Sequence, residues 1–168
     1  ESGEIWKINE NGVAEILTTN FEGKRLNGPN DLWLDNDGGI YFTDPLYVRD
    51  YWKNFKQEIF DKNLYYRNSE GKITKLDTFT QPNGIVGSLK FKKLYVSDID
   101  ANKTYVYDIA GAGKLTNKKL FCNLGSDGMT LDNLGNLYIT GNGVTVFNSK
   151  GEQIHHISVP ENWTANVT

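Results

Sequence analysis

Apolar and polar residues alternate with a period of two along most of the chain, and this alternation predicts β-strands. Short clusters that combine Gly with Asn, Asp or Ser separate the alternating runs, for example "NENG", "DNDGG", "NSEGK" and "DNLGN". Such clusters form tight hairpin turns because their residues tolerate positive φ. Strands are expected at residues 4–8, 13–18, 31–35, 39–43, 64–67, 73–79, 84–88, 93–98, 103–109, 115–122, 129–132, 136–140, 143–148 and 153–158. The pattern therefore predicts an all-β protein with almost no helix.

An internal repeat organises these strands. Each copy begins with a short, oxygen-bearing side chain just before an apolar strand. These three marked residues are Asn30, Asn83 and Asp127. A second strand follows 11, 12 and 11 residues later, and each carries a tyrosine: Tyr41, Tyr95 and Tyr138. The ending "WTANVT" resembles the start of a fourth copy, with Asn166 in the marked position.

The spacing of the repeat indicates a β-propeller. The steps between marked positions are 53, 44 and 39 residues, which suits one four-stranded blade each. The expected strands make about three and a half blades, whereas closed propellers have at least four. Residues 1–168 are thus expected to form a single, incomplete propeller region, whose open blade edges would favour self-association.

Residues 46–63 interrupt the repeat. This segment, "LYVRDYWKNFKQEIFDKN", is rich in aromatic residues and Lys and directly follows the strand "YFTDP". Two interpretations remain open: an insertion that acts as a lid over a site at one end of the propeller, or an ordinary long connection that packs its own aromatic side chains.

The composition excludes several classes of partner. The 18 basic and 21 acidic residues give a net charge of −3 without any basic run, so neither nucleic acid nor a membrane surface is expected. A single cysteine, Cys122, rules out a disulfide within the chain. The protein is expected to be soluble, either cytoplasmic or periplasmic, with the compartment itself unknown.

The marked residues suggest a metal site. The first strand of each blade lines the central channel of a propeller, so equivalent positions converge on its axis. Convergent amide and carboxylate oxygens suit a hard divalent cation. The alternative is that Asn and Asp merely cap turns at strand entrances by local hydrogen bonding.

Three motifs in order resemble the SMP-30/gluconolactonase family: "RLNGPNDLWLDNDGGIYFTDP", "QPNGIVGSLKFKKLYVSDID" and "GSDGMTLDNLGNLYIT". The resemblance implies a six-bladed propeller that hydrolyses sugar lactones or related esters with a central divalent metal ion. It implies that Asn83 and Asp127 bind the metal. It places Asn30 beside the metal, where it touches the substrate or a metal-bound water, and we count Asn30 both as a metal residue and as a substrate residue. The family's remaining ligand, a Glu in an "E-G-P/A" motif, has no counterpart in this sequence.

The expected chemistry follows from this ligand set. Asp127 is the candidate catalytic base, although metal ligation competes for the same carboxylate. Oxygen donors without Cys or His favour Ca²⁺, with Zn²⁺ and Mg²⁺ as alternatives. Arg25 is either a contact for a polyhydroxy lactone substrate or a solvated loop charge. The main alternative function is a non-catalytic propeller that binds calcium or a protein.

Other polar residues carry weaker signals. His155 and His156 are adjacent and point to opposite faces of a strand, so they cannot chelate one ion. Asp44 and Asp98 end equivalent strands, where they are expected to cap turns rather than bind a second ion. No G-x-S-x-G motif supports a serine hydrolase.

Overall fold

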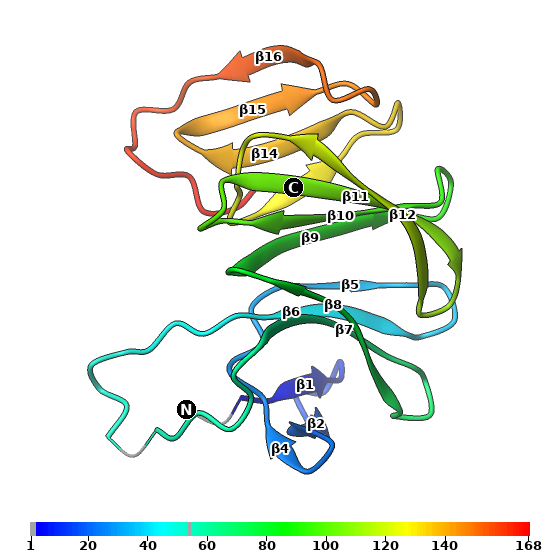
Figure 1. Cartoon of the computed structure of the whole chain (residues 1–168), viewed down its shortest axis with the longest axis vertical. Coiled ribbons are helices and arrows are strands. Elements are labelled where there is room, and N and C mark those ends of the chain that lie inside the picture. Colours follow the sequence, from blue (N-terminus) through cyan, green and yellow to red (C-terminus); the bar gives the residue numbers. More distant parts are fainter. Residues whose placement is uncertain (1–2, 54) are drawn as a thin grey trace.

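The computed structural model describes residues 3–53 and 55–168, which form strands, turns and connections. Strands pair only in antiparallel sheets, and no helix occurs within these ranges, so none there could span a membrane. Three four-stranded sheets follow one another along the molecule (Figure 1). The prediction of an all-β chain that forms part of a β-propeller is confirmed.

Each four-stranded sheet uses consecutive strands in sequence order, as a propeller blade does. The first blade contains β5 (Leu32–Leu34), β6 (Ile40–Asp44), β7 (Lys62–Arg67) and β8 (Ile73–Phe79). The second contains β9 (Pro82–Ser88), β10 (Lys93–Asp98), β11 (Lys103–Gly111) and β12 (Lys114–Cys122). The third contains β13 (Met129–Leu131), β14 (Leu137–Gly141), β15 (Gly143–Phe147) and β16 (Gln153–Ile157).

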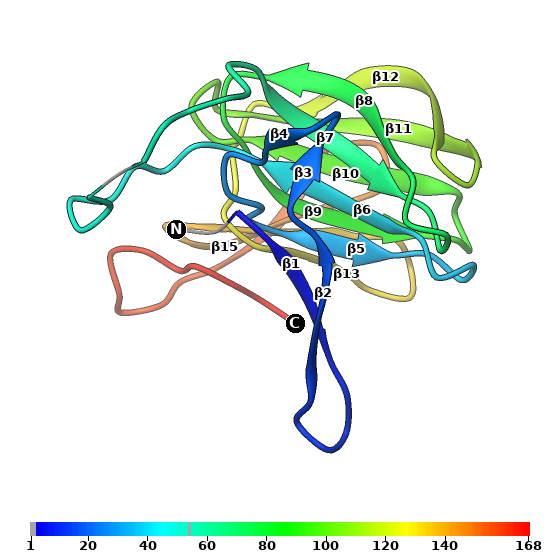
Figure 2. The same ribbon diagram turned by 90° about the horizontal axis from the view of Figure 1, so that it is seen from below.

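Two further hairpins precede the first blade. β1 (Ile5–Ile8) pairs with β2 (Ala14–Thr18), and this hairpin projects from the molecule in Figure 2. β3 (Asn20–Phe21) pairs with β4 (Lys24–Arg25). All fourteen predicted strands occur with ends within two residues of those expected, and β3 and β4 were missed because two residues are too few to show alternation.

Apolar cores fill the space between neighbouring blades. Tyr41, Leu64 and Leu94 are fully buried in a cluster between the first and second blades. A second cluster, around Leu137 and Ile139, lies between the second and third blades. Each blade therefore relies on its neighbours for burial, and the blade entrances are held at fixed relative positions.

A hydroxyl on the second strand of each blade links that blade to the entrance of the next blade. Thr43 donates a hydrogen bond to the carbonyl oxygen of Asn83 at 2.8 Å. Ser97 accepts one from the backbone N–H of Ser126 at 2.5 Å. Thr140 donates to the carbonyl oxygen of Ala165 at 3.3 Å. These three equivalent contacts position the marked residues through the backbone.

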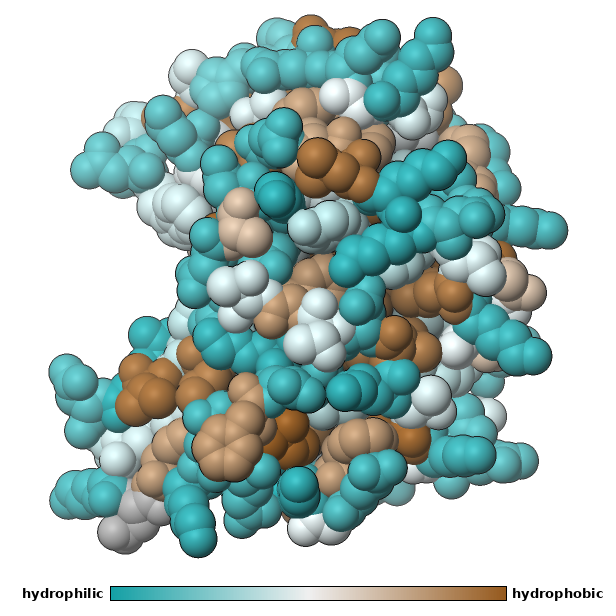
Figure 3. Space-filling model, in the orientation of Figure 1, coloured by the Kyte–Doolittle hydropathy of each residue, from teal (hydrophilic) through white to brown (hydrophobic). Residues whose placement is uncertain are grey.

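An apolar face remains open beside the first blade. A cavity of about 570 Å³ lies between the β1–β2 hairpin and β5, lined by Trp6, Leu32 and Leu34 among others. These three side chains are 51%, 43% and 58% exposed. Apolar patches also gather in the lower part of Figure 3, over the region of the first blade. Self-association through this open face stays a prediction.

Candidate functional site

The three marked residues lie at the entrances of successive blades. Asn30 stands two residues before β5, Asn83 is the second residue of β9, and Asp127 stands two residues before β13. These entrances share the edge of the molecule from which residues 46–63 leave β6, on the left of Figure 1. Figure 3 shows this edge hollowed between the 46–63 segment and the C-terminal residues.

Backbone contacts bring these entrances together. The N–H of Gly84 donates to the carbonyl oxygen of Ser126 at 3.4 Å. A Cβ atom at Gly84 would lie only 2.6 Å from the carbonyl oxygen of Asp127, so only glycine permits this approach. Thr43 connects the entrances of the first and second blades. Its carbonyl oxygen accepts a hydrogen bond from the N–H of Asn30 at 3.0 Å, and its hydroxyl donates to the carbonyl oxygen of Asn83. The roles of the three side chains stay predictions.

The side chain of Asn83 is the most distinctive feature of the site. It is buried, with 3% of its surface exposed. Its Nδ2 donates to the hydroxyl of Tyr47 at 2.7 Å, whereas its Oδ1 is buried without a hydrogen-bond partner. An unpartnered buried carbonyl is costly, and bound cations are among the partners that relieve this cost. Asn83 Oδ1 therefore fits a ligand for a hard metal ion.

Asp127 supplies a carboxylate at the blade entrance that contacts the entrance of Asn83. The side chain is half-buried, and its Oδ2 accepts a hydrogen bond from Trp163 Nε1 at 3.3 Å. Its negative charge contributes to raising the pKa values of Asp31 and Tyr47. The site thus combines one unpartnered amide oxygen with a partly exposed carboxylate.

Asp31 and Tyr47 are neighbours that the sequence reasoning did not select. Asp31 accepts hydrogen bonds from the N–H groups of Ile85 and Leu32, each at 2.9 Å, and thereby ties β9 to β5. Burial is the main cause that raises the pKa of Asp31. Asp31 follows the marked Asn directly, and this position in "PND" was the only signal that could have revealed it.

The remaining two marked residues, Asn30 and Asn166, lie in different surroundings. The exposed side chain of Asn30 lines a pocket of about 150 Å³ with Ile5 and Trp6. The side chain of Asn166, the fourth marked position, packs against Gly128, next to Asp127.

Arg25 contacts two residues of the 46–63 segment. Its guanidinium lies over the ring of Phe55, 4.9 Å from the centroid, and its charge acts to lower the pKa of Asp44. Its backbone N–H donates to Glu58 at 2.8 Å. These contacts do not involve Asn83 or Asp127, and a substrate contact by Arg25 stays a prediction.

The donor set limits the type of metal. Within residues 3–53 and 55–168, no group of three or more His, Cys, Asp or Glu side chains is placed to hold an ion. The candidate ligands are instead amides and one carboxylate, a set that hard cations such as Ca²⁺ accept. His155 and His156 lie on the exposed outer strand β16, as expected.

Asp44 and Asp98 cap the entrances of their own blades, as predicted. Asp44 accepts hydrogen bonds from the N–H groups of Asn27 and Gly28, at 3.0 and 2.7 Å. Asp98 accepts from Thr80 and Gln81, at 2.8 and 2.9 Å. Burial raises the pKa of Asp44 to about 6, although these hydrogen bonds and the charge of Arg25 oppose the rise.

The buried Asp44 should make stability depend on pH. A carboxyl whose pKa rises from 3.8 to about 6 on folding favours the native state below pH 4 and loses that contribution as pH rises through 6. We expect the free energy of unfolding of the wild type to gain about 2 kcal/mol relative to Asp44→Asn between pH 7 and pH 4. Urea unfolding of both proteins at several pH values measures this difference, and a difference that does not change with pH would contradict it.

Residues 46–63 contact the site at their root. Leu46 accepts a hydrogen bond from Gln81 at 2.9 Å, and Tyr47 binds Asn83. Further along, Trp52 packs against Phe55 with ring centroids 5.0 Å apart, while Tyr51 is 70% exposed. Outside residue 54 the stretch from Pro45 to Phe60 contains neither helix nor strand. Its function as a lid stays a prediction.

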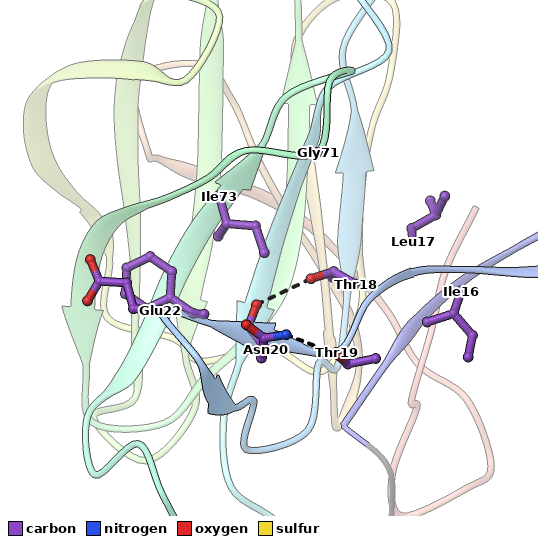
Figure 4. A pocket seen from close by; sticks show the side chains of 9 residues that line it. Ile16, Leu17, Thr18, Thr19, Asn20, Glu22, Gly71 and Ile73 are labelled. Carbon is purple, nitrogen blue, oxygen red and sulfur yellow. Dashed lines mark hydrogen bonds between the residues drawn. The ribbon is translucent and has the colours of Figure 1, made fainter.

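The pocket drawn in Figure 4 lies elsewhere. It has a volume of about 440 Å³ and is formed by β2, β3 and the start of β8. Its polar side chains form local hydrogen bonds, since the Thr18 hydroxyl donates to the backbone carbonyl of Asn20 and Asn20 Nδ2 donates to the Thr19 hydroxyl. None of the marked residues lines it, so we do not take it as the functional site.

Comparison with known proteins places the chain among lactone-hydrolase relatives. The sequence profile described as the SMP-30/Gluconolactonase/LRE-like region matches residues 2–168. A gluconolactonase of Zymomonas mobilis is 30% identical over 159 residues, covering 85% of this chain and 45% of that protein. A diisopropyl-fluorophosphatase of Loligo vulgaris is 30% identical over 156 residues, covering 83% and 49%. The chain thus spans about half the length of these curated relatives.

Solved structures agree with the propeller fold. A gluconolactonase of Xanthomonas campestris superposes with a TM-score of 0.89 at 29% identity, covering 99% of this chain and 58% of that chain. The covered 58% of that chain is close to the fraction that three and a half blades form of a six-bladed propeller. A regucalcin of Agrobacterium tumefaciens, described as calcium-binding, has a TM-score of 0.75 at 22% identity and supports the fold alone.

Proposed function

This chain belongs to the SMP-30/gluconolactonase/LRE-like family, and from that premise we propose that the protein containing it hydrolyses a sugar lactone or a related ester with the help of a divalent cation. The unpartnered, buried Oδ1 of Asn83 carries the proposal, together with the backbone contact that joins its blade entrance to the entrance with Asp127.

Asn83 Oδ1 and the Asp127 carboxylate would hold the ion, and Asn30 would face the substrate from the entrance of the first blade. Ca²⁺ is favoured because these donors are hard oxygens, and Mg²⁺ and Zn²⁺ are alternatives. When bound, the cation would polarise the lactone carbonyl and stabilise the negative charge that develops on its oxygen.

The chain's own residues would bind the substrate and move the proton. Asn30, exposed at the entrance of β5, would donate a hydrogen bond to the substrate. Asp127 would accept a proton from the water that attacks the carbonyl carbon. The ring C–O bond then breaks, and the proton passes to the leaving alkoxide to give a hydroxy acid.

The test is metal removal. Hydrolysis of glucono-1,5-lactone, followed with a pH indicator in the longest natural protein that contains this chain, should stop in EDTA and return with Ca²⁺. We expect a loss of at least about 100-fold, since a cation that polarises the carbonyl contributes several kcal/mol. Mg²⁺ and Zn²⁺ added in parallel identify the preferred ion.

Two further outcomes are informative. Diisopropyl fluorophosphate should be assayed beside the lactone, because one relative is a diisopropyl-fluorophosphatase. Full lactone turnover in EDTA would contradict the metal-dependent mechanism. Metal binding without turnover of either substrate would favour a non-catalytic, calcium-binding propeller.

A further inference from the structure

Among the residues of the 46–63 segment that the structure describes, only Tyr47 has a side chain that forms a hydrogen bond with a marked residue. Its hydroxyl accepts a hydrogen bond from Asn83 Nδ2 at 2.7 Å, a short distance for a neutral pair. The segment is anchored directly before this contact, since Gln81 Nε2 donates a hydrogen bond to the carbonyl oxygen of Leu46 at 2.9 Å. Tyr47 is therefore held at the root of the segment rather than at its exposed tip.

The contact with Tyr47 satisfies the donor end of the Asn83 amide in one of its two orientations. An asparagine amide has one donor end and one acceptor end, and a 180° rotation exchanges them. A hydroxyl could bind either end, but only the observed orientation leaves Oδ1 free and aims the donor at Tyr47. Because the side chain is 97% buried, water does not compete for either end.

We infer that Tyr47 is a positioning residue, which fixes the amide of Asn83 so that its oxygen faces the cation. This inference rests on the proposed function, because it assumes that Asn83 is a metal ligand. It goes further in assigning a task to the 46–63 segment, since the root of that segment would determine the affinity of the site for metal. Groups that orient a ligand in this way typically change metal affinity by 10–100-fold when they are removed.

The experiment compares Ca²⁺ affinity in wild type and Tyr47→Phe by isothermal titration calorimetry, with Tb³⁺ luminescence as a second probe. The phenylalanine keeps the ring and removes only the acceptor, so we expect the dissociation constant to rise by about tenfold or more. Tyr51→Phe is the matched control, because Tyr51 lies on the same segment and is 70% exposed. It should bind Ca²⁺ as the wild type does.

A second background separates positioning from a general structural effect. In Asn83→Asp both side-chain oxygens are equivalent, so no orientation needs to be fixed. Adding Tyr47→Phe to this background should change the dissociation constant by less than about twofold. An equally large loss in both backgrounds, or equal affinities of wild type and Tyr47→Phe, would overturn the inference while leaving the proposed function intact. A wild type that binds neither Ca²⁺ nor Tb³⁺ would overturn the metal-dependent function and this inference together.

Discussion

Asp127→Asn should lower the rate of lactone hydrolysis by about 10³-fold, because it removes the only carboxylate among the three marked residues. The substitution is isosteric, and the amide oxygen can still accept the hydrogen bond from Trp163. The loss would therefore come from the missing charge and proton acceptor rather than from disturbed packing. Initial rates with glucono-1,5-lactone at saturating Ca²⁺ measure this effect.

Asp50→Asn is the control for Asp127→Asn. It makes the same chemical change on an exposed turn of the 46–63 segment, where we expect no effect on the rate. A Ca²⁺ titration of Asp127→Asn separates the two duties of this carboxylate. A lower rate with nearly normal Ca²⁺ affinity indicates a base, whereas weakened binding indicates a ligand. A rate within tenfold of the wild type would contradict both roles.

Gly84→Ala should damage the site although it adds only one methyl group. The new Cβ would meet the carbonyl oxygen of Asp127 at 2.6 Å, and a backbone atom cannot move aside as a flexible side chain can. The entrances of the second and third blades must then separate. We expect a loss of roughly 1–3 kcal/mol in the free energy of unfolding and of about 10²-fold in rate, since a displacement of about 1 Å disturbs a catalytic site severely.

Gly141→Ala provides the matched comparison for Gly84→Ala. A Cβ at Gly141 meets nothing within 4 Å, and the residue ends β14 without a positive φ. The variant should keep both stability and rate. Thermal unfolding and lactone assays of the two variants together check the argument, which fails if Gly84→Ala is as active as Gly141→Ala.

The sequence allowed the fold to be predicted well because strands and turns are local features. Alternation of apolar residues identified every strand of five or more residues, and glycine-containing clusters identified the turns between them. The repeat then indicated blades, because residues at equivalent positions occupy equivalent places in a ring. The sequence pattern did not predict the β3–β4 hairpin, because each of its strands contains only two residues.

The site was less predictable because its key relations are tertiary. Asn83 was selected from its motif, but the free Oδ1 and the Tyr47 contact depend on how a long connection folds back. Such a connection carries no periodic signal. Asp31 was passed over since an Asp at a strand entrance usually caps a turn, whereas here it also holds the N–H of Ile85 in the next blade. Long-range hydrogen bonds of this kind leave no mark in local sequence.

The hydroxyl links between blades have a consequence for how such a site can diversify. The hydroxyls of Thr43, Ser97 and Thr140 each form a hydrogen bond with a backbone atom of the following repeat. None of these three bonds involves the marked side chain of that repeat. A duplicated repeat would therefore inherit its attachment to the ring whatever residue it carried at the marked position. Asn, Asp or another side chain can be exchanged there while the frame stays constant. The residue type at the marked positions can therefore change during evolution while the backbone contacts of the propeller are kept.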